Sequence, residues 1–123
     1  MWKGVIIGES LENKRLLSSV DIVGTKKSFL EGEKNKGIFH LYKILVGDSE
    51  KLSFVAAASK AIKQGFYIHI CHGGRMVVIF KDKIFEFSEQ DNEKIEAAKM
   101  YGTSIGILKV QMDFEYLLHN PYG

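Results

Sequence analysis

Two adjacent glycines, Gly73-Gly74, separate two runs of β-forming residues and constrain the fold more strongly than any other feature of the chain. The run before them is Phe66–His72, and the run after them is Arg75–Phe80. A Gly-Gly pair between such runs is typical of a two-residue hairpin, because both turn positions need a positive φ. A second turn at Lys81–Lys83 leads into another β-forming run, Ile84–Phe87. This part of the chain is therefore expected to form antiparallel strands.

The N-terminal half of the chain predicts three more strands, at Trp2–Gly8, Val20–Phe29 and Ile38–Val46. Between the first two, Ser10 is expected to cap a short helix at Leu11–Ser19. The polar residues 30–36 predict a turn between the second and third strands.

Helices are expected at three further places. The clearest begins after Asp48 or Ser49 and ends before Gly65, because its apolar residues recur with the spacing of one helical face: Phe54, Val55, Ala58, Ala61 and Ile62. Later segments predict a helix from Ser88 to Gly102, a loop at Thr103–Val110 and a final helix at Asp113–His119.

The predicted element order is β-α-β-β-α-β followed by β-β-α-α. This order predicts an α+β fold with an antiparallel sheet, a ferredoxin-like βαββαβ core and a ββαα extension, in which strand one lies between strands three and four. We expect a single domain over residues 1–123, with the core in 1–72 and the strand hairpin and C-terminal helices in 73–123. Alternatively, strands four to six form a separate sheet against the C-terminal helices.

Composition narrows the class of protein. The 123 residues are 46% hydrophobic and 26% charged, which is typical of a globular chain that can bury a core. One cysteine excludes an internal disulfide. The apolar runs are too short to span a bilayer and the N-terminus has no cleavage pattern, so we predict a cytoplasmic protein without a membrane partner.

No nucleic-acid partner is expected. The 17 basic and 15 acidic residues give a net charge of +2, without a block of like charge. The glycines of Gly4–Gly8 do not have the spacing of a nucleotide-binding loop. In the third strand Lys36 and Gly37 fit the aromatic strand motif of RNA-recognition modules, but Ile38, Phe39, His40 and Lys43 break it.

The densest group of chemically useful side chains lies in the fourth predicted strand. His69, Cys71 and His72 bring two of the four histidines and the one cysteine within four residues. Strand alternation places Tyr67, His69 and Cys71 on one face. The opposite, apolar face is expected to pack against the helices, so these three side chains are predicted to lie on the open face of the sheet.

His40 and Tyr42 of the third strand join them on that face if Phe39, Leu41 and Leu45 pack inward. His40 and His69 would then lie roughly 10 Å apart across strand one, with Gly4 as a shallow floor between them. The candidate ligand-binding residues are therefore His40, Tyr42, Tyr67, His69 and Cys71. We expect no metal site and no cofactor, because no third metal ligand, paired-cysteine motif or carboxylate pair accompanies them.

Two functional hypotheses follow. The first is a non-enzymatic binding or assembly module that forms a homodimer or binds a small-molecule ligand on its open sheet face. The second is a small cofactor-independent enzyme that uses His69 and His40 in a cavity. A cavity lined by both histidines favours the enzyme, whereas a flat apolar face favours the module. The simpler structural interpretation is a hydrogen-bonded strand histidine and a cysteine that serves as a small core residue.

Overall fold

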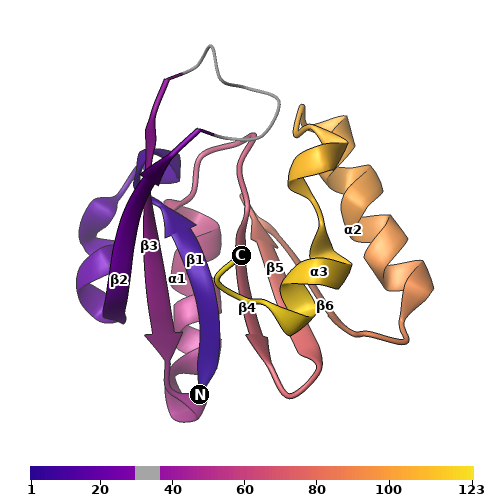
Figure 1. The fold of residues 1–123 in the computed structure, drawn as a ribbon, viewed down its shortest axis with the longest axis horizontal. Coiled ribbons are helices and arrows are strands. Elements are labelled where there is room, and N and C mark those ends of the chain that lie inside the picture. Colours follow the sequence, from indigo (N-terminus) through magenta and orange to yellow (C-terminus); the bar gives the residue numbers. More distant parts are fainter. Residues whose placement is uncertain (30–36) are drawn as a thin grey trace.

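The computed structural model describes residues 1–29 and 37–123 and has the predicted mixed α+β architecture (Figure 1). Its antiparallel sheet has six strands in the order β2-β3-β1-β4-β5-β6. The strands are β1 Trp2–Ile7, β2 Asp21–Ser28, β3 Phe39–Val46, β4 Ile68–His72, β5 Arg75–Phe80 and β6 Lys83–Ser88. The α-helices are α1 Lys51–Ala61, α2 Asn92–Ser104 and α3 Phe114–His119, and short 3₁₀ segments are η1 Gly8–Ser10, η2 Lys14–Ser19, η4 Asp48–Glu50 and η5 Lys109–Gln111.

The two predicted turns of the C-terminal half are confirmed. His72 of β4 pairs with Arg75 of β5 around Gly73-Gly74, whose φ angles are 55° and 79°. The β5–β6 turn contains Asp82 at a φ of 57°. Because β4 also pairs with β1, the alternative of a separate sheet for strands four to six is wrong.

The short helix predicted at Leu11–Ser19 is present only as a 3₁₀ helix at Lys14–Ser19, so its predicted end is confirmed and its predicted start is wrong. Leu11 instead forms an isolated bridge with Ile62, and a 3₁₀ segment begins only at Lys14. The residue that caps this segment is Asn13, whose side chain accepts a hydrogen bond from the backbone N–H of Arg15. The same bridge ends α1 at Ala61, before the predicted end near Gly65, because Ile62 is drawn into extended backbone. The turn predicted at 30–36 lies outside the described residues.

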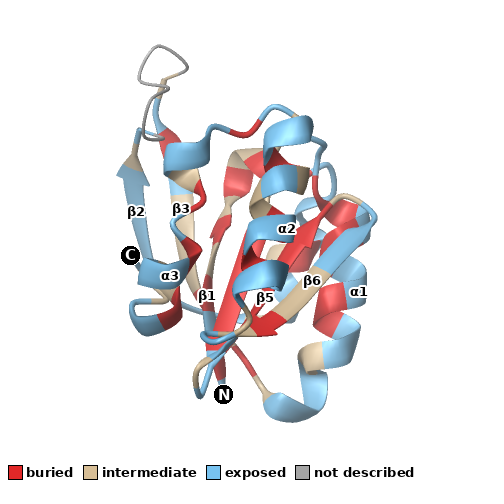
Figure 2. Ribbon diagram, turned by 90° about the vertical axis from the view of Figure 1, so that its right-hand side faces the viewer, coloured by how far each residue is buried: buried red, intermediate tan, exposed pale blue. Residues whose placement is uncertain are grey.

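Both faces of the sheet carry a buried core, as the side view in Figure 2 shows. We call the first the α1 face. Its strand residues pack against α1 and η2, and they are Trp2, Ile6, Ile44, Val46, Ile68, Ile70, Val77 and Ile79. We call the second the α3 face. Its strand residues pack against α2, α3 and the segment between them, and they are Cys71, Met76, Val78, Phe80 and Phe87.

The α3 face is covered unevenly. Helix α3 packs on β4 and α2 packs on β6, whereas none of the described helices lies in front of β2, β3 and β1 (Figure 1). Alternation places Val5, Ile7, Leu41 and Leu45 on this part of the face, and all four are only half-buried. The described chain thus leaves half of one sheet face without a helical cover.

None of the helices in the described parts of the chain is long and apolar enough to cross a bilayer.

Candidate functional site

The five predicted site residues do not share one face. His69 and Cys71 lie on the α3 face with Tyr67, as the alternation predicted. Tyr42 lies on the α1 face, because it pairs with the buried Ile6 and packs against that core. His40, two residues earlier on β3, alternates to the same side as Tyr42. The predicted pairing of His40 with His69 across one open face is therefore wrong.

The physical reason lies in β3, which is apolar on both sides. Of the predicted inward set of Phe39, Leu41 and Leu45, Phe39 is buried and the two leucines are only half-buried, whereas Ile44 and Val46 on the other side of the strand are buried in the core. Gly4 also lies on the α1 face, since it pairs with Ile44, and it is not the floor of a site beside His69.

The side chains of Tyr67, His69 and Cys71 hold the C-terminal segment against the sheet. The Tyr67 hydroxyl donates to the carbonyl oxygen of Gln111. His69 Nε2 lies 2.7 Å from the carbonyl oxygen of Pro121, and Cys71 Sγ lies 3.5 Å from that of Leu117. The face around β4 is therefore covered rather than open.

Burial keeps all three groups in their neutral forms. Burial raises the pKa of the Tyr67 hydroxyl, and the nearby Asp113 carboxylate raises it further. Burial also raises the pKa of the Cys71 thiol to about 12. It lowers the pKa of His69 to about 4, although the hydrogen bond to Pro121 acts in the opposite direction. Cys71 is therefore not an activated nucleophile, since the thiolate is the reactive form.

The Tyr67 hydrogen bond provides a first test of this covering. Tyr67→Phe is expected to lower the free energy of unfolding by about 1 to 2 kcal/mol, because the partly buried Gln111 carbonyl loses its phenol donor. Tyr116→Phe is the matched control: the Tyr116 side chain is half exposed on α3, and its loss should change the free energy little. Urea denaturation of both variants measures the difference. Equal stability of the two would contradict the assigned role of Tyr67.

His40 instead forms hydrogen bonds with Glu9 at the start of β3. Its Nδ1 lies 2.5 Å from Glu9 Oε2, and its backbone N–H donates to Glu9 Oε1 at 2.8 Å. Partial burial raises the pKa of Glu9, but these hydrogen bonds outweigh it and leave that pKa below its usual value. Both side chains are largely exposed, and Tyr42 and Lys14 border a hollow beside them. This contact joins β3 to η1, and it could not be predicted from local sequence patterns because Glu9 lies 31 residues from His40.

A cavity of about 90 Å³ lies on the α3 face beside His69. It is lined by residues of β1, β3, β4 and the segments before β4 and around η5: Val5, Ile7, Leu41, Gly65, Phe66, Tyr67, His69, Ile107 and Gln111. The described lining is mostly apolar, and it includes His69, whose Nδ1 has no hydrogen-bond partner among the described residues. The described residues contain no group of three or more side chains that could hold a metal ion.

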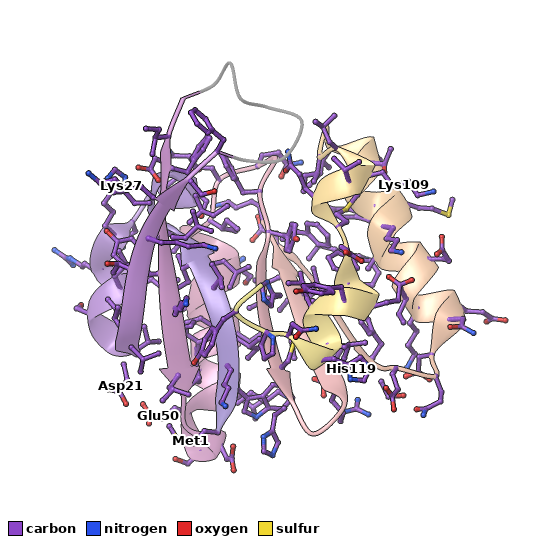
Figure 3. All side chains as sticks on the ribbon, viewed as in Figure 1. Met1, Asp21, Lys27, Glu50, Lys109 and His119 are labelled. Atoms are coloured by element: carbon purple, nitrogen blue, oxygen red, sulfur yellow. The ribbon has the colours of Figure 1, made fainter. Side chains whose placement is uncertain are left out.

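The half of the α3 face without a helical cover combines apolar and basic side chains, and three of its apolar residues, Val5, Ile7 and Leu41, also line this cavity. Tyr122 of the C-terminal segment reaches this half: its ring lies 5.8 Å from Lys43 Nζ, and its hydroxyl donates to the carbonyl oxygen of Ile44 at 3.1 Å. We call Val5, Ile7, Leu41, Leu45, Lys3, Lys26 and Lys43 the β1–β3 patch. Asp21 is the acidic residue that alternates to this side, and Figure 3 shows it at the lower end of β2, at the margin of the patch. Sequence reasoning missed the patch because it assigned Leu41 and Leu45 to the buried core.

Comparison of the chain with protein-family models, with curated proteins and with solved structures gives no match, so the function must be argued from these surfaces alone.

Proposed function

We propose that the protein is a non-enzymatic binding module that holds an acidic, amphipathic protein segment on the β1–β3 patch. The observation that carries the proposal is the row of half-buried apolar side chains on β1 and β3, which the described helices leave uncovered. Contiguous apolar surface of this kind marks interaction sites, because leaving it in water costs free energy.

The basic side chains of the β1–β3 patch favour an acidic partner. Lys3, Lys26 and Lys43 lie on three adjacent strands of the patch, and Asp21 at its margin is their acidic counterpart. A second copy seated face to face would bring these lysines together, which costs free energy when like charges lose solvent. An acidic partner gains from the same charges. We therefore propose a different acidic chain, rather than a second copy, as the occupant.

The enzyme alternative has weaker support. His40 and His69 lie on opposite faces, and burial holds the Cys71 thiol and the His69 ring in their neutral forms. A general acid–base pair needs both groups within reach of one substrate.

We also propose that β1 to β4, with η2 and α1, follow a ferredoxin-like plan to which β5 and β6 are added. The order β2-β3-β1-β4, in which strand one lies between strands three and four, supports this assignment.

A designed peptide tests the proposed function. The probe is a helical peptide of about 15 residues with leucines at i, i+3, i+4 and i+7 and glutamates elsewhere. We expect it to shift the amide resonances of Val5, Leu41 and Leu45 in an NMR titration, and to bind more weakly in high salt. The matched control peptide carries lysine in place of every glutamate and should not bind.

Two variants localise the binding. Leu45→Glu places a charge in the apolar row and should weaken the acidic peptide more than tenfold, since burying an unpaired charge is costly. Lys43→Glu should weaken it by up to roughly fivefold, the worth of one exposed ion pair. The proposal fails if both peptides bind equally, if the shifts lie outside the patch, or if light scattering shows a dimer that Leu45→Glu dissociates.

A further inference from the structure

We infer that the cavity beside His69 is a binding site for a small neutral molecule with an apolar body and one hydrogen-bond donor, such as a hydroxyl or a ring N–H. The inference does not depend on the proposed protein partner. It follows from the position of a buried imidazole at the edge of an apolar cavity, with one ring nitrogen engaged and the other available.

The hydrogen bond to Pro121 fixes which nitrogen carries the proton. A carbonyl oxygen only accepts, so the ring nitrogen 2.7 Å away, Nε2, must be the donor. In the neutral imidazole the second nitrogen, Nδ1, is then an acceptor. His69 offers a ligand a hydrogen-bond acceptor and no charge.

Nδ1 is reachable although the residue as a whole is 6% exposed. Every fully buried side-chain nitrogen or oxygen of the described residues has a hydrogen-bond partner. Nδ1 of His69 has no such partner among them, so it is not fully buried. Because His69 lines the cavity, we infer that Nδ1 is the ring atom it presents there.

The lining residues and the volume of the cavity indicate the polarity and the size of the ligand. The side chains of Val5, Ile7, Leu41, Phe66 and Ile107 present carbon to the cavity, and the described residues that line it include no Asp, Glu, Lys or Arg. A charged ligand would lose its hydration here without a counter-ion, whereas an apolar body gains from burial. A volume of about 90 Å³ is also smaller than the cavity of roughly 150 Å³ that holds benzene in the best-known engineered case, so the ligand is a small one.

Pyrrole and furan form a matched pair of probes. Both are flat five-membered rings of similar size, but only pyrrole carries a hydrogen-bond donor. We expect pyrrole to move the His69 Nδ1 resonance in a ¹⁵N NMR titration and to saturate at or below about 10 mM. Furan should bind about tenfold more weakly, because it leaves Nδ1 unpaired.

Variants on one strand separate the cavity from the rest of the face. Leu41→Trp fills the cavity and should abolish the pyrrole shift, whereas Leu45→Trp, on the same strand and face but outside the lining, should leave it intact. Ile7→Phe is a second blocking variant should Leu41→Trp fail to fold. Amide spectra confirm that each variant is folded.

The inference is overturned if pyrrole and furan bind equally, if pyrrole does not saturate, or if it binds without moving the Nδ1 resonance. The pyrrole and furan titrations are run without the acidic peptide. The peptide proposal is tested separately with the Lys43 and Leu45 variants, because neither residue lines the cavity, whereas Val5 and Leu41 belong to both sites.

Discussion

Gly4→Ala is expected to break the pairing of β1 with β4 at the centre of the sheet. A Cβ atom at position 4 would lie 1.9 Å from the carbonyl oxygen of His69 and 2.9 Å from Cγ2 of Ile70. The closest of these atoms belongs to the backbone of the paired strand, so it cannot turn aside as a side chain would. Relief requires β1 and β4 to separate, and β1 joins the two halves of the sheet. We expect a loss of at least about 3 kcal/mol in the free energy of unfolding.

Gly24→Ala is the control for this substitution. Gly24 also lies in a strand, but an added Cβ there would lie 3.3 Å from Cδ of Lys43, which is part of a long and flexible side chain. Strand β2 is also at the edge of the sheet. We expect a change below about 1 kcal/mol. Urea denaturation compares the two variants, and a Gly4→Ala protein as stable as Gly24→Ala would show that the strands do not approach as closely as described.

Stability is expected to fall on mild acidification because of His69. Its pKa is about 4 in the folded protein and near 6.5 when unfolded, so the unfolded chain binds the proton more readily. A group with a depressed folded pKa contributes stability above its unfolded pKa and loses that contribution as the pH falls toward its folded pKa. From pH 7 to pH 5 the free energy of unfolding should drop by about 2 kcal/mol from this group alone.

His69→Gln should remove this pH dependence. The glutamine amide can still donate to the Pro121 carbonyl, but it does not titrate. Carboxylates whose pKa is lowered by folding, such as Glu86 and Glu115, make the free energy of unfolding depend on pH only below their usual pKa near 4.5. They therefore change the stability little between pH 7 and pH 5. Urea denaturation at several pH values measures both proteins. A wild-type curve that is flat between pH 7 and pH 5, or a variant with the same slope, would contradict a buried neutral His69.

Local sequence signals predicted the elements of the C-terminal half well. The Gly73-Gly74 hairpin, strand β5 and helix α3 all lie within one residue of their predicted positions. These elements depend on turn geometry and on residues close in the chain. The helix predicted at Leu11–Ser19 begins only at Lys14, because Leu11 forms a bridge with the distant Ile62.

The candidate site shows a different limit. Alternation along the predicted strand Phe66–His72 correctly separated Tyr67, which precedes β4, and His69 and Cys71 of β4 from Ile68 and Ile70. When both sides of a neighbouring strand are apolar, alternation does not tell which of its two sides shares a sheet face with His69. In β3 both sets are apolar, and the register of Ile44 opposite Gly4 decided the question. His40 was therefore assigned to the wrong face.

The covering of the α3 face was also beyond the sequence signals. The final helix was predicted, but nothing local to it indicates that the Pro121 carbonyl meets His69, 52 residues earlier. Groups that resembled a ligand site in the sequence are used instead to hold the C-terminal segment. The uncovered patch lies one strand away, on β1 and β3.

The exposure of the β1–β3 patch, and its protection by an acidic partner, is the central claim. A soluble paramagnetic compound tests it directly, because it broadens the NMR signals of methyl groups that it can approach. We predict strong broadening for Leu41 and Leu45 and none for Val78, which is buried under the C-terminal elements. Adding the acidic peptide should protect Leu41 and Leu45, while the basic peptide should not. Methyl groups of Leu41 and Leu45 that are as protected as Val78 in the free protein, or that stay broadened with the acidic peptide present, would contradict the account.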